Sequence, residues 1–321
     1  MKPALIALAK LAVSAILIAV VVRAFDVRGA LERIASAGPV DTLMALALAA
    51  AILPLQTLRW KVVLRESGHE LPFARALGLV WIGQFFSQVL PSSVGGDALR
   101  MWYAHKSGMA PGPAIVTVIV DRVVSLLGIL VLVAGGLPWL LRAMPEGAAR
   151  TGIVVLVAAG VAGFAVVALF AADAPWLHRW RPARVLLAPW VLLRRILLAP
   201  RRLAFALASS VAGTAGFCAV VFQLGRALGL ELGLADCLLL FPPVMLATAI
   251  PISVAGWGLR EGAMVVVLGY VHVAAADAFA LSVLFGLVVI VASLPGVAFW
   301  LARGDAAGSL SQAARFDSTR G

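Results

Sequence analysis

The chain contains 321 residues, of which 63% are hydrophobic and only 13% are charged. A soluble fold of this length could not bury so much apolar surface, which excludes a soluble enzyme, a nucleic-acid-binding domain and a disordered protein. The class that remains is an all-α polytopic membrane protein. The formal net charge of +11 therefore indicates loops held at an anionic cytoplasmic leaflet, rather than a nucleic-acid partner.

Full membrane spans need ~20 consecutive apolar residues, which predicts about six of them along the chain. The predicted spans are 3–22, 40–58, 113–137, 152–172, 204–224 and 278–302. A cleaved signal peptide is the alternative for 3–22, but the length of this run and the lack of a clear cleavage site favour a span. A further segment, 262–275, is apolar but short.

Two other apolar stretches, about 76–99 and 236–260, are each interrupted near their end by a cluster of Pro, Gly and Ser. Residues 91–100 match residues 251–260 at six of ten positions, and six further matches relate 65–77 to 226–238. This similarity predicts an internal duplication with an offset of about half the chain. The alternative is convergence of two Gly/Pro turns in apolar helices.

The distribution of charge predicts the topology of the two halves. The loops 59–75 and 173–203 are rich in arginine and are therefore expected in the cytoplasm. Both can lie there only if 76–99 enters the membrane and returns on the same side. The repeat halves, about 40–137 and 204–302, then have opposite orientations, and each carries a re-entrant segment broken by Pro and Gly. This is the inverted-repeat architecture of transporters, in which broken segments at matching positions mark the substrate site. A full crossing by either broken segment or by 262–275 would change this arrangement.

This topology predicts a single membrane domain, 1–303, in a bacterial-type inner membrane, with both termini in the cytoplasm. The basic linker 173–203 is expected to form short interfacial helices divided by Pro182, Pro189 and Pro200, although a simple topology anchor explains its charge equally well. The tail 304–321 is small and polar and is expected to be disordered.

Ionisable residues inside the predicted spans and turns are the candidate functional residues, since each costs ~2.5–3.5 kcal/mol near the bilayer centre. Asp97 and Arg100 are three residues apart and can pair on one helix. Adjacent residues point ~100° apart, so Asp121 is expected to find a partner other than Arg122, most readily in a re-entrant turn. The same geometry predicts that Arg260 and Glu261 do not pair.

We therefore expect a central polar cavity in which arginines bind a lipid phosphate and acidic residues hold these arginines when the cavity is empty. Glycines would let the backbone approach the ligand, and serines would satisfy backbone groups or contact a headgroup. The predicted substrate-binding residues are Ser93, Gly95, Gly96, Asp97, Arg100, Asp121, Arg122, Ser253, Gly256, Gly258, Arg260 and Glu261. The alternative is structural, with turn glycines, capping serines and arginines that extend to the interface. Arg59 and Trp60 are interpreted as ordinary anchors at a span end.

Four motifs occur in a characteristic order: Leu58-Arg59-Trp60, Pro91 to Arg100, Asp121-Arg122 and Pro251 to Glu261. In this order they resemble the transmembrane family of lysylphosphatidylglycerol synthase, over about 40–300. The resemblance implies a flippase-like module, here expected without the synthase domain. The chain also resembles stand-alone modules that accompany hopanoid and polyprenyl-phosphate pathways. Relatives commonly have Asn before the first Pro, where this chain offers Gln84 and Gln88.

The function we expect is translocation of an anionic phospholipid, a polyprenyl-linked lipid or a hopanoid-type lipid. A non-transporting scaffold for a lipid-modifying enzyme is the alternative, and a membrane-embedded transferase is disfavoured because no nucleotide or nucleophile motif is present. No catalytic residue, metal or cofactor is expected. The expected partners are membrane lipids and, in the scaffold alternative, a lipid-modifying enzyme.

Overall fold

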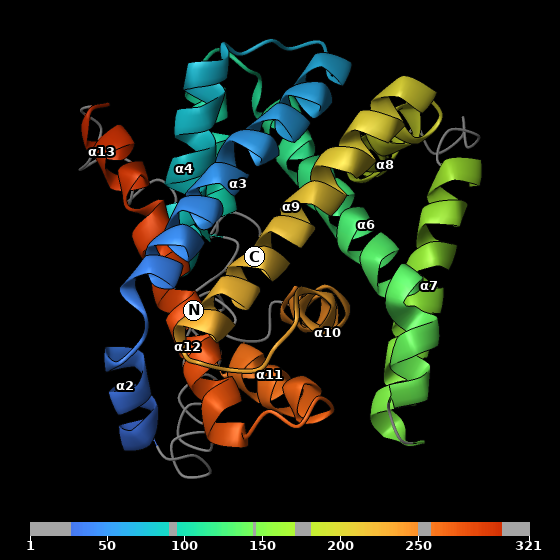
Figure 1. Cartoon of the computed structure of the whole chain (residues 1–321). Helices are drawn as coiled ribbons and strands as arrows, with labels where there is room; N and C mark the ends of the chain where they lie inside the picture. Colours follow the sequence, from blue (N-terminus) through green and yellow to red (C-terminus); the bar gives the residue numbers. More distant parts are fainter. Residues whose placement is uncertain (1–26, 90–94, 144–145, 171–180, 250–257, 304–321) are drawn as a thin grey trace, which may run out of the picture. The chain divides into compact units, whose positions relative to one another are not determined.

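A computed structural model describes residues 27–89, 95–143, 146–170, 181–249 and 258–303. Every regular element in these ranges is an α-helix, as Figure 1 shows. The helical class predicted from composition is therefore confirmed for the described residues. The predicted first span 3–22 and the tail 304–321 lie outside these residues.

Five helical stretches are long and apolar enough to cross a bilayer, among the residues that the structure describes. They belong to α3 (Pro39–Glu66), α6 (Pro111–Ala143), α7 (Ala148–Phe170), α9 (Pro200–Ala227) and the pair α12 (Ala275–Ser293) and α13 (Pro295–Leu301). Each coincides with one of the spans predicted from hydropathy after the first. All five begin one to four residues before the predicted spans, and α3, α6 and α9 also end three to eight residues after them, because polar residues continue the helix outside the apolar core.

Shorter helices lie between these long ones. They are α2 (Val27–Ala35), α4 (Phe73–Val89), α5 (Gly95–Lys106), α8 (Arg181–Leu197), α10 (Leu234–Thr248) and α11 (Leu259–Gly269). The pairs α4/α5 and α10/α11 occupy the two interrupted apolar stretches. The residues between the members of each pair, 90–94 and 250–257, are outside the described ranges.

The order of the helices follows the internal similarity of the sequence. Helices α3 and α9 each have 28 residues and begin at prolines 161 residues apart, and a pair of short helices follows each. Both long helices end in the same turn, at Gly68 with φ 78° and Gly229 with φ 69°. The N–H of Gly68 donates to Arg65 O at 3.0 Å, and that of Gly229 donates to Arg226 O at 2.9 Å. Glycine is favoured at this left-handed position after a helix because it has no Cβ.

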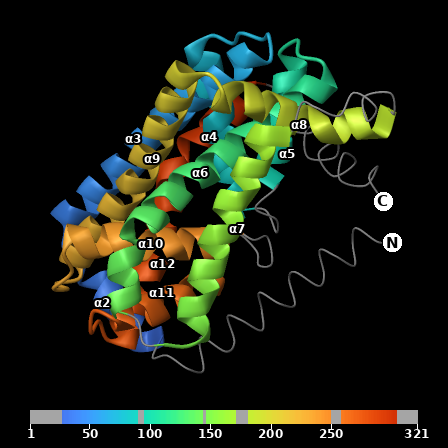
Figure 2. The same cartoon turned by 90° about the vertical axis from the view of Figure 1, so that its right-hand side faces the viewer.

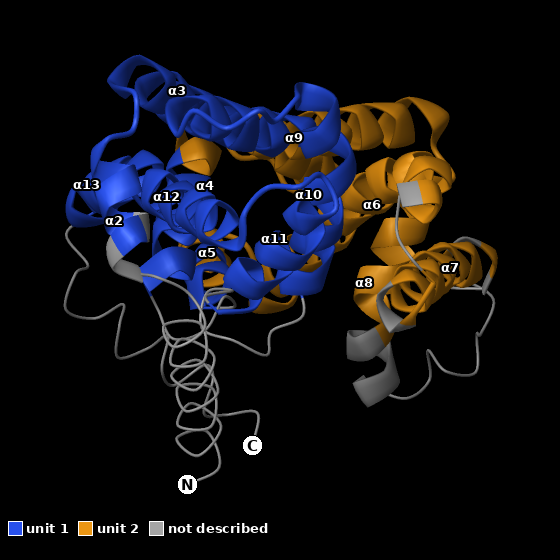
Figure 3. Ribbon diagram, turned by 60° about the horizontal axis from the view of Figure 1, so that its bottom comes forward, with its two compact units in different colours: residues 1–53, 78–100, 215–321 blue, residues 54–77, 101–214 orange. Residues whose placement is uncertain are grey.

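The chain divides into two compact units, which Figure 3 colours separately. Unit 1 comprises 1–53, 78–100 and 215–321, and unit 2 comprises 54–77 and 101–214. In unit 1, α12 packs against α2, α11 and α13, and α10 packs against α11. The buried residues Phe279 and Ala280 form a small core there. The units therefore do not coincide with the two sequence repeats.

In unit 2, α6, α7 and α8 pack against one another (Figure 2). Helix α7 nevertheless leaves a wide apolar face uncovered, with Val155, Val166 and Leu169 each more than half exposed. A soluble protein would avoid such a face, whereas lipid tails solvate it. This surface is what a membrane-spanning helix at the edge of a bundle requires.

The structure corrects the prediction for the linker 173–203. Pro189 does not divide it, since α8 continues through this residue from Arg181 to Leu197. Interior proline removes a helix hydrogen bond, and the packing of α8 on α6 and α7 offsets that loss. Pro182 lies in the first turn of α8 and Pro200 begins α9, where proline is well tolerated.

Candidate functional site

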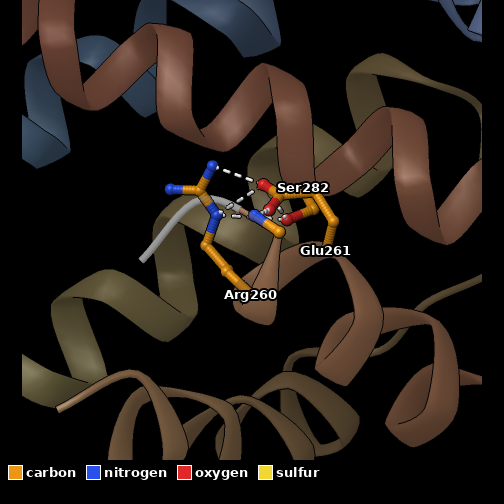
Figure 4. Close-up of polar contacts among 4 residues, drawn as sticks. Arg260, Glu261 and Ser282 are labelled. Carbon is orange, nitrogen blue, oxygen red and sulfur yellow. Dashed lines mark hydrogen bonds and ion pairs between the residues drawn. The ribbon is translucent and has the colours of Figure 1, made fainter. Parts of the chain in front are cut away.

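The second interrupted stretch leads into a buried polar cluster at the start of α11 (Figure 4). Its members are Arg260, Glu261 and Ser282, which are 7%, 2% and 0% exposed. Arg260 Nη2 lies 2.7 Å from Glu261 Oε1, and Arg260 Nε donates to Ser282 Oγ at 3.1 Å. Ser282 Oγ in turn donates to Glu261 Oε1 at 3.2 Å. A buried charge pair is stable only when its remaining donors and acceptors are satisfied in this way.

The backbone at the helix start holds Glu261 in place. Gly258 has a φ of 85°, a conformation that residues with a Cβ rarely adopt. This turn directs its N–H to Glu261 Oε2 at 2.5 Å. The carboxylate thus lies at the positive end of α11, where a negative charge is favoured.

The prediction that Arg260 and Glu261 do not pair is wrong. The argument from the ~100° angle between neighbours holds in the middle of a helix, where both side chains project outward. In the first turn, Glu261 instead bends back toward Gly258, and the long arginine side chain follows its carboxylate. Helix ends therefore allow pairs between neighbours that helix interiors disfavour.

Two phenylalanine side chains, Phe285 and Phe241, lie beside this cluster. The guanidinium of Arg260 lies 5.6 Å from the ring centroid of Phe285, within the range of a cation–π contact. Phe285 makes an edge contact with Phe241, with centroids 5.1 Å apart. Neither Ser282 nor Phe285 was predicted as a site residue, because each lies in an apolar run of α12 that looks like an ordinary span.

The first interrupted stretch leads into α5, which begins with Gly95, Gly96 and Asp97. A Cβ at Gly96 would lie 1.9 Å from Gly83 O and 2.2 Å from Ser87 Oγ, so only glycine fits between α4 and α5. Asp97 is 8% exposed. The close approach explains why this turn needs glycine for packing, besides any role in binding.

Arg100 lies one turn further along α5 and is 6% exposed. Its side chain passes close to α4, since a Cβ at Gly83 would lie 3.7 Å from Arg100 Cδ. The two turns therefore each present one buried arginine just after the interruption, at positions that match in the repeat. The other predicted turn residues, Ser93, Ser253 and Gly256, lie outside the described residues.

Asp121 forms a buried ion pair with Arg59 in unit 2. Arg59 Nε donates to Asp121 Oδ1 at 2.9 Å, and the residues are 5% and 1% exposed. The expectation that a re-entrant turn supplies the partner of Asp121 is therefore corrected. Arg59 and Trp60 are not span-end anchors, because α3 continues to Glu66 and Trp60 is fully buried.

Arg122 differs from its neighbour, since its side chain is exposed whereas Asp121 is buried. The angle between adjacent helix positions accounts for this contrast. Arg122 belongs to unit 2, whereas Arg100 and Arg260 belong to unit 1. The joint binding of one phosphate by these three arginines stays a prediction.

The model of the lysylphosphatidylglycerol synthase transmembrane region matches residues 7–296. The chain belongs to this family. The match confirms the resemblance drawn from the four motifs and extends it to the predicted first span. The family is a transmembrane region associated with lipid-related function, and together with the apolar helices it identifies a multi-pass membrane protein. A comparison with curated proteins finds no match.

Hydrogen-bond donors of three kinds surround the Glu261 carboxylate at the start of α11. The Glu261 carboxylate accepts from a backbone N–H, a guanidinium and a hydroxyl, which are the donor types that bind a phosphate oxygen. The residues around this carboxylate therefore offer hydrogen-bond donors and a positive charge.

Proposed function

We propose that this protein translocates a lipid with an anionic headgroup across the bacterial inner membrane. The observation that carries this proposal is the buried Arg260–Glu261 pair at the start of α11, inside a strongly apolar chain. Intramembrane ionisable residues are costly, and they mark substrate pathways when no structural need explains them. The candidate cargoes are an anionic phospholipid, a polyprenyl-linked lipid and a hopanoid-type lipid.

In this proposal the headgroup phosphate replaces Glu261 as the partner of Arg260. The guanidinium offers a planar pair of donors that suits phosphate, and the N–H of Gly258 adds a backbone donor. Arg100 plays the same role in the first turn, with Asp97 as its anionic counterpart. The headgroup then passes between donors that are already oriented, which lowers the cost of leaving water.

We further propose that the two halves form an inverted repeat with re-entrant segments at α4/α5 and α10/α11. The matched helices α3 and α9 and their identical end turns support the duplication. The arginine-rich linker 173–203 supports the orientation, because basic loops stay in the cytoplasm. Both termini would then be cytoplasmic.

Labelling of single cysteines tests this topology. Glu70→Cys, Trp190→Cys and Leu230→Cys would be made in a background without the buried Cys218 and Cys237. The expected result is labelling of 70 and 190 from the cytoplasmic side and of 230 from the periplasmic side. Labelling of position 190 by an impermeant reagent outside the cell would contradict the inverted repeat.

Lipid flipping in reconstituted vesicles tests the function. Labelled phosphatidylglycerol and a labelled polyprenyl phosphate would be compared in vesicles with the wild type, the Arg100→Ala/Arg260→Ala double variant and Arg142→Ala. Arg142 is an exposed arginine in the last turn of α6, and its replacement controls for general loss of charge. We expect flipping by the wild type and by Arg142→Ala, and loss of most of the rate in the double variant.

Two outcomes of this assay would overturn the proposal at different levels. Equal rates in the wild type and the folded double variant would remove the two turns as the site. Absence of flipping for both lipids, with and without an ion gradient, would contradict the translocator and favour the scaffold for a lipid-modifying enzyme.

A further inference from the structure

A basic pocket of about 400 Å³ opens in unit 2, whereas the two turns belong to unit 1. It lies where the end of α3 meets the connection between α8 and α9. Its polar lining consists of three arginines and one carboxylate, and its remaining wall is apolar. The lining residues are Arg194, Arg195, Arg202, Glu66, Val191 and Leu198, with Ala199 between the helices.

The pocket lies at the level expected for lipid headgroups. Helix α3 ends at Glu66 and α9 begins at Pro200, and both helices are candidate spans of 28 residues. Such a helix is about 42 Å long, whereas the hydrocarbon core is ~30 Å thick. The ends of both helices therefore project into the headgroup region, on the side that the proposed topology places in the cytoplasm.

Charge in the pocket favours an anion. Glu66, at the end of α3, accepts a hydrogen bond from Arg202 Nη1 at 2.8 Å, and its side chain is only 12% exposed. Among the residues that line the pocket, this one carboxylate faces three arginines. Arg194 and Arg195 add two further positive charges from the last turn of α8. A net positive pocket at an anionic leaflet attracts a phosphate.

The arrangement of α8 separates its apolar and basic sides. Leu193 and Ile196 are buried in the unit, at 1% and 0% exposure. Leu198 is 57% exposed beside the arginines, so an apolar surface continues from the basic one. A free inorganic anion would leave this apolar surface exposed, whereas the glycerol and upper acyl chain of a lipid would bury it.

We propose that this pocket binds the phosphate headgroup of an anionic phospholipid of the cytoplasmic leaflet, in competition with Glu66. None of its lining residues belongs to the proposed translocation path, and binding here does not require that the protein flips lipids. Arginine forks at 194, 195 and 202 would take the phosphate oxygens. The Glu66 carboxylate already accepts from Arg202, and it would hold this arginine when the pocket is empty.

Binding of lipids to the delipidated full chain, followed by native mass spectrometry, tests this site. The probes are phosphatidylglycerol, zwitterionic phosphatidylcholine and glycerol 3-phosphate. The variants are Arg194→Gln/Arg195→Gln and Glu66→Gln. The matched control is Arg65→Gln/Arg201→Gln, which removes the same charge from two exposed arginines that do not line the pocket.

We expect the wild type to prefer phosphatidylglycerol over phosphatidylcholine. The Arg194/Arg195 double variant should lose at least about tenfold in affinity, because each arginine near an anionic lipid contributes roughly fivefold. Glu66→Gln should bind several-fold more tightly, since Arg202 is released. The control variant should keep its preference, and all variants should retain wild-type helical content by circular dichroism.

Three results would overturn the proposal. Equal losses in the pocket variant and the control would show general surface attraction. Binding of glycerol 3-phosphate as tight as that of phosphatidylglycerol would assign the pocket to a soluble phosphate compound. An unchanged or lower affinity in folded Glu66→Gln would exclude competition by this carboxylate.

Discussion

Two buried arginine–carboxylate pairs in the described part of the chain differ in how their members are connected. Arg59 and Asp121 are 62 residues apart and connect α3 to α6 within unit 2. Arg260 and Glu261 are neighbours at the start of α11 in unit 1. The first pair joins two membrane-spanning helices, whereas the second is local to one helix end.

The surroundings of the two carboxylates suggest different roles. Glu261 also accepts from the N–H of Gly258 and from Ser282, so it lies in a set of donors that suits any anion. Arg59 and Asp121 lie in the interior of long helices, more than one turn from either end. The long-range pair is expected to serve the fold, and the local pair is expected to serve the substrate.

The largest effect should come from breaking the long-range pair. Asp121→Ala leaves the guanidinium of Arg59 buried without its carboxylate, which should lower the free energy of unfolding by about 3–5 kcal/mol. Unfolding by sodium dodecyl sulfate in mixed micelles, followed by circular dichroism, measures this loss.

The double variant Arg59→Met/Asp121→Leu is the control for this prediction. It replaces both charges by apolar groups of similar size and should recover most of the lost stability. Wild-type stability of Asp121→Ala, or a double variant as unstable as the single one, would show that the pair does not tie α3 to α6.

A smaller effect is expected from the local pair. Glu261→Gln keeps an acceptor for Gly258 and Ser282 but removes the charge that faces Arg260. Hydrogen bonds to charged groups contribute about 1.5–3 kcal/mol, so the loss of unfolding free energy should be below that of Asp121→Ala. The same variant should bind phosphatidylglycerol more tightly if Arg260 is the headgroup ligand, because its internal competitor is gone.

Native mass spectrometry of Glu261→Gln, with Arg260→Gln/Glu261→Gln beside it, measures the lipid effect. The second variant lacks the arginine and should lose the gain. Tighter lipid binding that persists without Arg260 would show that the gain comes from the general surface charge. A loss of stability as large as that of Asp121→Ala would remove the contrast between the two pairs.

Hydropathy predicted the positions of the long apolar helices well, because a membrane span needs an apolar composition over a fixed length. The apolar runs of the sequence form long helices, and five of the described helical stretches are long and apolar enough to cross a bilayer. The internal similarity also left a direct signal, since Gly68 and Gly229, which follow α3 and α9 with positive φ, match in the sequence alignment of the two halves. Features that a run of apolar residues or a single glycine specifies could therefore be predicted from the sequence.

Pairing of charges was less predictable. Arg59 looked like a span-end anchor because the hydropathy falls at Leu58, yet the helix continues and buries the arginine. Its partner Asp121 is 62 residues away, and no local pattern specifies such a contact. The prediction for Arg260 and Glu261 failed although these residues are neighbours, because a rule for helix interiors was applied to a helix end. Tertiary contacts and cap geometry decided both cases.

The smallest effect should come from Ser282, which joins the two charged groups of the local pair. Ser282→Ala removes the acceptor of Arg260 Nε at 3.1 Å and the donor to Glu261 Oε1 at 3.2 Å. Arg260 Nε keeps Glu261 Oε1 at 3.2 Å, so neither charge is left without a partner. The expected loss is therefore about 0.5–1.5 kcal/mol of unfolding free energy.

Ser293→Ala in the same helix is the matched control, since Ser293 is also buried but its hydroxyl donates to Ile290 O at 2.7 Å, within its own helix. Its replacement should change stability less than Ser282→Ala, because a carbonyl inside a helix depends little on a second donor. Equal effects of the two replacements would mean that Ser282 acts as an ordinary small core residue. A larger loss at Ser282, together with weaker discrimination between phosphatidylglycerol and phosphatidylcholine, would place the hydroxyl in the anion site, because it then orients the guanidinium that the headgroup meets.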